Sequence, residues 1–174
     1  MELAFYICAF SNNQHNLDNE INRGISNTPF YRVLQSPMIE AVVVHCDQQA
    51  TTFSRAWCIF EFFLAHDLDI NYILNSRFGP LQSIAVDSPS SRLWLLHMFE
   101  MLQAMDISKA QASNPKDFHW IIDEVRKFKP TLDQLERIGG GAACQGPEAL
   151  NRILKGLIAD RVLVLAAKMN DGLV

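Results

Sequence analysis

The sequence predicts an α/β fold, because strand-like apolar runs alternate with helical segments along its first half. Strands are expected at 4–10, 39–46 and 70–74, and helices at 29–35 and 53–66. This order favours a layered structure with right-handed crossovers. We therefore expect an α/β core over about residues 1–86 and a helical C-terminal region over 87–174 that packs on it.

Each element of the first half rests on a local pattern. Residues 4–10 form an apolar, aromatic run that ends in a polar loop, which is typical of a buried strand. Thr28 and Pro29 predict a helix start, because the hydroxyl caps the helix and proline suits its first position. Three consecutive valines within 39–46 predict a strand that is buried on both faces, as in a parallel sheet.

The second half is predicted to be mainly helical. A fourth strand is expected at 81–86, and a helix opens near Ser90. Asn114 followed by Pro115 predicts another helix, which should run to about residue 128. Three glycines at 139–141 predict a flexible break, and apolar residues at helical spacing predict a last helix over 147–168.

The bulk properties exclude several classes of protein. The chain has 174 residues, 49% hydrophobic and 20% charged, which suits one globular domain. A net charge of −4 without a lysine-rich run argues against nucleic-acid binding. No apolar run reaches the roughly 18–20 residues of a transmembrane helix. Four cysteines without C-x-x-C spacing favour free thiols in a reducing compartment, so we expect a cytoplasmic protein.

The segment 51–66 is the most informative stretch, because it predicts an almost wholly apolar helix that carries one acid, Glu61. At 100° per residue, Ser54, Cys58 and Glu61 fall on one face of such a helix. A carboxylate on a buried helix is costly unless it meets a partner, a pocket or water. The segment therefore predicts where a site lies.

Two strings of this chain resemble a known family. They are Cys8-Ala-Phe-Ser-Asn-Asn-Gln-His15 after a strand, and Ser54-Arg-Ala-Trp-Cys-Ile-Phe-Glu61 after a valine-rich strand. The second string resembles the Trp-Cys-x-x-Glu helix of Toll/interleukin-1 receptor (TIR) domains. Together the two strings look like a TIR-like family that occurs as modules in large proteins of algae and other protists. The stretch 105–117 resembles the segment after the TIR-like core in that family.

The resemblance implies a flavodoxin-like parallel sheet followed by the helical region. TIR domains begin with a strand and a helix that would lie upstream of Ala4, so we expect an N-terminally truncated sheet. Three arrangements stay open. The chain is a fragment, or the strand at 4–10 pairs directly with 39–46, or a partner fills the gap.

The resemblance also implies a chemistry. In active TIR domains the motif glutamate serves to split NAD at the nicotinamide–ribose bond, and that role falls on Glu61 here. The residues implied to line the nucleotide pocket are Asn12, Asn13, Gln14, His15, Ser54, Trp57 and Cys58. NAD would be the substrate, and neither a resident cofactor nor a metal is expected, since the histidines lack metal-ligand spacing.

Each of these residues also has a purely structural interpretation. In that interpretation Glu61 pairs with Arg55 or another cation at a helix edge, and Trp57 belongs to the core. Cys58 is then a small buried apolar side chain, and His15 anchors its loop. Two functions therefore stay open: an NAD nucleosidase, and a non-catalytic interaction module or structural subunit with a protein partner or self-association. The last helix is the candidate docking element, with packing on its own domain as the alternative.

Overall fold

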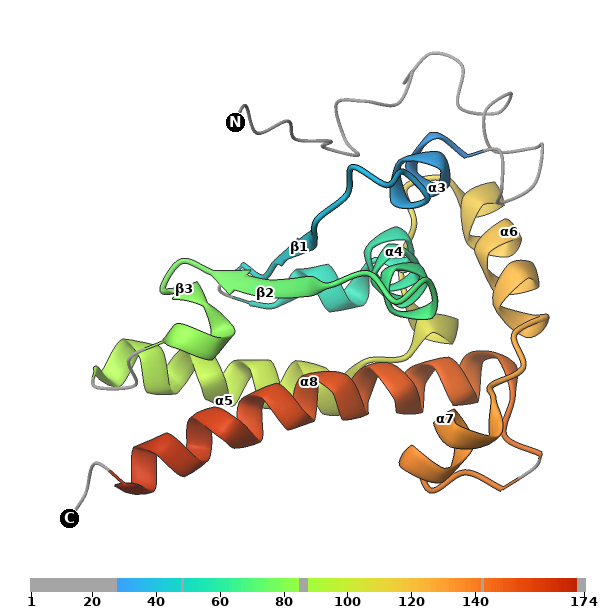
Figure 1. Ribbon diagram of the computed structural model, residues 1–174. Helices are drawn as coiled ribbons and strands as arrows, with labels where there is room; N and C mark the ends of the chain where they lie inside the picture. Colours follow the sequence, from blue (N-terminus) through green and yellow to red (C-terminus); the bar gives the residue numbers. More distant parts are fainter. Residues whose placement is uncertain (1–27, 48, 85–87, 142, 172–174) are drawn as a thin grey trace.

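The computed structural model describes residues 28–47, 49–84, 88–141 and 143–171 (Figure 1). The predicted strand at 4–10 and the loop residues Asn12, Asn13, Gln14 and His15 lie outside these ranges. The described elements, in chain order, are α3 (Pro29–Leu34), β1 (Val42–His45), the 3-10 helix η2 (Thr51–Ser54), α4 (Ala56–Asp67), β2 (Tyr72–Ser76), β3 (Gly79–Pro80), η3 (Leu81–Ser83), α5 (Pro89–Ala104), η4 (Ile107–Lys109), α6 (Pro115–Arg126), α7 (Leu132–Arg137) and α8 (Gly146–Asp171).

The described sheet is small and mixed, with the strand order β1-β2-β3. β1 runs parallel to β2 and pairs Val44 with Leu74, and the connection between these two strands contains α4. β3 is antiparallel to β2 and pairs Pro80 with Asn75. The prediction of an α/β protein is therefore confirmed, and the strands predicted at 39–46 and 70–74 correspond to β1 and β2.

The prediction that 39–46 is buried on both faces is wrong. Val44 is 8% exposed, whereas its neighbour Val43 is 55% exposed. Successive side chains of a strand point to opposite faces. Val42 and Val44 pack against the hydrophobic core on one face, while Val43 and His45 are exposed on the other. The run of valines is thus an alternating, one-sided strand.

The predicted strand at 81–86 is also wrong over its described residues, since Leu81–Ser83 forms the 3-10 helix η3. The chain turns immediately before it. Phe78 N donates to Ser76 Oγ at 3.0 Å, and Gly79 adopts a φ of 99°, which favours glycine. Leu81 is fully buried, and η3 contacts α8. The apolar residues of this segment therefore serve packing without extending the sheet.

The predicted helix starts are largely confirmed. Thr28 Oγ1 accepts from Tyr31 N at 3.4 Å at the start of α3, and Asn114 Oδ1 accepts from Lys116 N at 3.0 Å at the start of α6. The helix expected near Ser90 is α5, which begins at Pro89 after a Ser88 cap. The last helix, expected over 147–168, is α8. The short helix α7 was not predicted.

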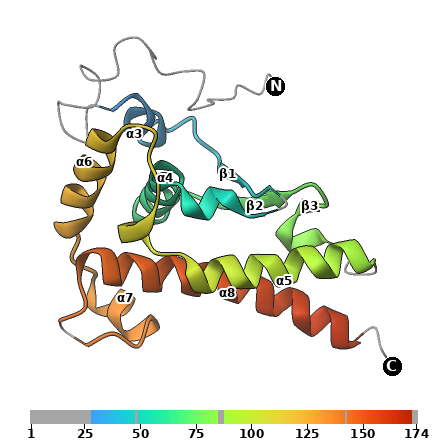
Figure 2. The ribbon, with the colours of Figure 1, turned by 180° about the vertical axis from the view of Figure 1, so that it is seen from behind.

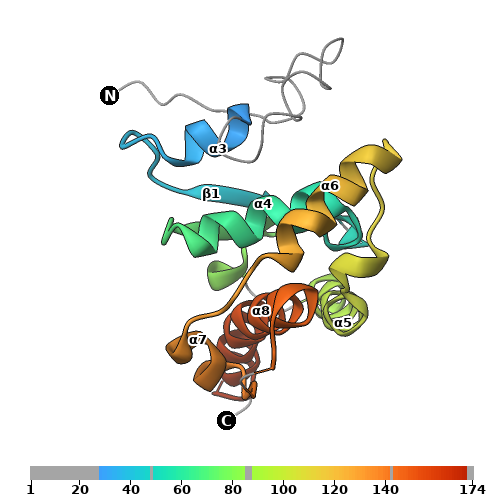
Figure 3. The same ribbon diagram turned by 90° about the vertical axis from the view of Figure 1, so that its right-hand side faces the viewer.

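The elements are arranged in layers. α5 and α8 lie side by side on one side of the sheet and α4, and α6 lies against α4 and the start of α8 (Figures 1 and 2). Figure 3 shows the order α3, β1, α4 and α8 across the molecule. One hydrophobic cluster joins the first half of the chain to the helices of the second half. Among the described helices, none combines the length and apolarity needed to cross a membrane.

Candidate functional site

The site lies where the chain leaves the carboxyl end of β1 and starts α4. Thr52 Oγ1 donates to the carbonyl oxygen of His45 at 2.6 Å, which ties η2 to the end of β1. Ala50 precedes η2 in a left-handed conformation with a φ of 52°. The carboxyl ends of parallel strands are the usual place for ligand sites in α/β proteins. The local backbone therefore brings η2 and the first turn of α4 to such a position.

Ser54 does not lie on the α4 face predicted for it. α4 begins only at Ala56, because Arg55 is extended with φ −102° and ψ 122°. Ser54 belongs to η2 instead, where its hydroxyl donates to the carbonyl oxygen of Thr51 at 2.7 Å. The expectation that Ser54, Cys58 and Glu61 share one helical face is therefore wrong for Ser54.

A segment from the second half of the chain forms the opposite side of the site. Arg55 and Gln111 form an isolated parallel bridge. Gln111 N donates to Ser54 O at 2.8 Å, and Ala56 N donates to Gln111 O at 2.9 Å. These two bonds hold 111–113 against the start of α4, before Asn114 caps α6.

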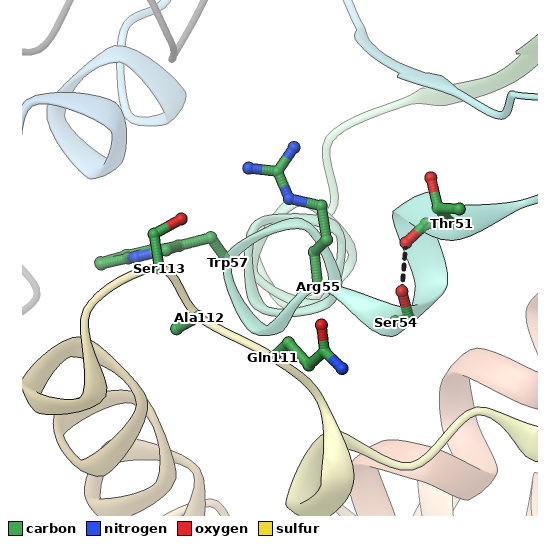
Figure 4. Close-up of a pocket in the computed structure, with 7 residues that line it drawn as sticks. All are labelled: Thr51, Ser54, Arg55, Trp57, Gln111, Ala112 and Ser113. Atoms are coloured by element: carbon green, nitrogen blue, oxygen red, sulfur yellow. Dashed lines mark hydrogen bonds between the residues drawn. The ribbon is translucent and has the colours of Figure 1, made fainter.

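An open cavity of about 390 Å³ lies between these two segments. Figure 4 shows Trp57, Ala112 and Ser113 on one side, Thr51 and Ser54 on the other, and Arg55 between them. Its lining residues are Thr51, Ser54, Arg55, Trp57, Gln111, Ala112 and Ser113. Two residues of the predicted pocket, Ser54 and Trp57, are thus brought together. The other five lining residues were not assigned to a pocket from the sequence.

Trp57 packs against the hydrophobic core and also lines the cavity. Its Nε1 donates to Asp117 Oδ2 at 3.1 Å, and its ring lies 5.8 Å from that of Trp120 and 6.4 Å from that of Phe30. The side chain is half-buried and also lines the cavity. The ring is consequently held by packing and by one hydrogen bond, so it offers a rigid wall.

Cys58 and Glu61 lie further along α4, and neither lines the cavity. Both are half-buried. Burial raises the pKa of the Cys58 thiol above its ordinary value of 9.0, and the negative charge of Glu61 raises it further, while Arg55 partly opposes this. Cys58 is therefore a neutral thiol near pH 7 and not an activated nucleophile.

The salt bridges among the described residues do not include one between Glu61 and Arg55, although Glu61 is not without a partner. Cys46, Cys58 and Cys144 are free, which confirms the thiol prediction for these three. Within the described ranges, no group of three His, Cys, Asp or Glu side chains is placed to hold a metal ion.

Comparisons of the chain with protein-family models, with curated proteins and with solved structures found no match. What the structure defines is a class: an α/β protein with a small mixed sheet, a helical second half and an open cavity at the start of α4. Its function has to be argued from the residues of this site, because a fold alone does not fix a function.

Proposed function

We propose that this chain is a TIR-like module with flavodoxin-like layering that binds an NAD-type nucleotide and cleaves its nicotinamide–ribose bond with Glu61. One observation carries the proposal. Ser54 and Trp57, which the TIR resemblance assigned to the nucleotide, line one cavity beyond the carboxyl end of β1. The parallel pairing of β1 with β2 through α4 is compatible with such layering.

The chemistry needs a negative charge near the ribose. Cleavage of the bond develops positive, oxocarbenium-like charge on the sugar, and a carboxylate stabilises it. Glu61 lies outside the cavity lining, so in this proposal it would supply that carboxylate to a nicotinamide ribose that extends along α4 beyond the cavity. Cys58 is a neutral thiol, so it does not compete as a nucleophile on this face of α4. NAD is the substrate in this proposal, and no resident cofactor is required.

The test is release of nicotinamide from NAD by the purified chain, followed by chromatography. Glu61→Gln keeps the size of the side chain and removes its charge, and it should lower the rate by about 100-fold or more. Glu100→Gln on the exposed side of α5 is the matched control and should leave the rate unchanged. Release that persists in Glu61→Gln, or no release by the wild type, would contradict catalysis by this residue.

The second candidate function is a non-catalytic interaction module or structural subunit. The end of α8 favours it. Leu163 is 60% exposed and Val164 is 54% exposed, in a part of α8 that diverges from α5 (Figures 1 and 2). Buried residues of α8 extend only as far as Val162 among the described side chains. No nicotinamide release, together with a sedimentation coefficient that rises with protein concentration, would favour this function over the enzyme.

A further inference from the structure

The cavity at the start of α4 combines one positive charge with two kinds of polar group. Some can only accept hydrogen bonds from a ligand, and others can both donate and accept. Arg55 is exposed, and in the described part of the chain its guanidinium forms no salt bridge. It therefore keeps its fork of N–H donors for a ligand. An arginine in this position suits an anion, because charge-assisted hydrogen bonds to carboxylate or phosphate are short and strong.

The hydroxyl side of the cavity offers acceptors. The Ser54 hydroxyl donates to Thr51 O at 2.7 Å, and the Thr51 hydroxyl donates to the Asp47 carboxylate. A hydroxyl has one hydrogen and two lone pairs, so both oxygens still accept but no longer donate. This side is thus suited to ligand groups that donate hydrogen bonds, such as the hydroxyls of a sugar.

The opposite side offers both roles. The side chains of Gln111 and Ser113 form no hydrogen bond with other described residues, so the amide and the hydroxyl are available to donate and to accept. The half-buried ring of Trp57 adds an apolar wall on this side, fixed by its bond to Asp117. Two carboxylates contact lining residues, and both already accept hydrogen bonds: Asp47 from Thr51 and Asp117 from Trp57.

We propose that this cavity binds a hydroxylated anion, with Arg55 holding the negative group and the hydroxyls of Thr51 and Ser54 accepting from the ligand's O–H groups. A phosphorylated sugar and a sugar acid share this chemistry. The inference deepens the proposed function, because a nucleotide carries both a phosphate and ribose hydroxyls. It is nevertheless tested without any cleavage, since Arg55 and Glu61 are separate groups.

The experiment is a titration of the ¹⁵N-labelled chain, followed through the indole N–H of Trp57 and the side-chain amide of Gln111. Ribose 5-phosphate and glucuronate are the two charged probes, and ribose and inorganic phosphate carry one feature each. At least one charged sugar should bind more tightly than either ribose or phosphate. Whichever of ribose 5-phosphate and glucuronate binds more tightly shows whether the site prefers a phosphate or a carboxylate.

Arg55→Gln should weaken binding of that probe by about tenfold or more. Arg77→Gln is the matched control, because its guanidinium lies over the ring of Phe78 at 4.6 Å and outside the cavity. Unchanged affinity in Arg55→Gln overturns the role of Arg55. If neither ribose 5-phosphate nor glucuronate binds more tightly than both ribose and inorganic phosphate, the combined role of the anion and the hydroxyls is overturned.

The result also separates this inference from the proposed function. Binding of the probe without nicotinamide release leaves the cavity as a site and refutes cleavage by Glu61. Nicotinamide release without binding of any charged sugar refutes anion binding in the cavity, while cleavage by Glu61 remains supported. Glu61→Gln should leave the affinity for ribose 5-phosphate within about twofold, because Glu61 does not line the cavity.

Discussion

The two sides of α4 differ in what their residues do. On the buried side, Ile59, Phe60, Phe62 and Phe63 are at most 3% exposed and join the helix to the sheet and to the second half of the chain. On the other side, Trp57, Cys58 and Glu61 are only partly covered, and Arg55, which precedes the first turn of the helix, is exposed. One helix thus divides its residues between holding the fold and presenting chemistry.

The division explains how a helix with so little polar character carries a site. The buried side contributes apolar burial, at roughly 25 cal/mol per Å². The partly covered side keeps a cation, a carboxylate and a thiol close enough to influence one another, as the raised pKa of Cys58 indicates. Variants on the first side should therefore change stability, and variants on the second side should change binding or reactivity.

The largest effect is expected for Phe62→Ala. Phe62 is 1% exposed, and its ring lies 4.9 Å from that of Tyr72 on β2. Removal of a buried phenylalanine side chain leaves a cavity and should lower the free energy of unfolding by about 3–5 kcal/mol. Urea unfolding, followed by circular dichroism, measures the loss.

Arg55→Gln, at the exposed residue that precedes α4, is the control and should change the free energy of unfolding by less than about 0.5 kcal/mol. Equal losses in the two variants would show that both sides of α4 hold the fold. The same measurement verifies that Arg55→Gln is folded in the binding experiment.

Trp57 lies at the border between the two sides, and Asp117→Ala tests its anchor. Loss of the acceptor leaves the indole N–H without its bond of 3.1 Å, which should cost about 1.5 kcal/mol of unfolding free energy. Asp123→Ala on the same helix removes an exposed ion pair with Arg126 and should cost less than about 0.5 kcal/mol.

A double-mutant cycle with Trp57→Phe separates this bond from the effect of the Asp117 charge on the first turn of α6. Additive losses would mean that ring packing alone orients Trp57.

Local sequence patterns account for most of the described elements. The capping residues Thr28 and Asn114 predicted the starts of α3 and α6, and the apolar content of 53–66 predicted α4. α7 was not predicted because it is only six residues long, which is too short for its apolar spacing to stand out, and none of its residues is buried. The capping box of Thr131 and Gln134 is the sequence pattern that could have predicted the start of α7. The strand prediction at 81–86 is wrong over Leu81–Ser83, because apolar residues can also be buried from a 3-10 turn.

The site was less predictable, for a physical reason. Ser54 and Trp57 could be named because they are close in sequence to Glu61. Gln111 and Ser113 could not, because their place depends on tertiary pairing of 111–113 with the start of α4. The helical projection that grouped Ser54 with Glu61 assumed a continuous helix, and the extended backbone of Arg55 breaks it.

The smallest effects are expected at Cys58, whose reactivity reports the charges on the partly covered side of α4. Its pKa is raised by burial first and by Glu61 second, and Arg55 lowers it. Alkylation by iodoacetamide, followed by mass spectrometry of the Cys58 peptide across pH 7–10, should have its midpoint above 9.0. Glu61→Gln should move that midpoint down, and Arg55→Gln should move it up.

The same shift has a consequence for stability. Because the folded pKa lies above the unfolded one, the unfolded chain loses this proton first as the pH rises. The contribution of Cys58 is therefore fully present below pH 9.0 and is lost as the pH rises above it. If the alkylation midpoint of Cys58 were the same in the folded chain as in urea, the charge of Glu61 would have no effect on the thiol. The partly covered side of α4 would then be no more than a set of independent side chains.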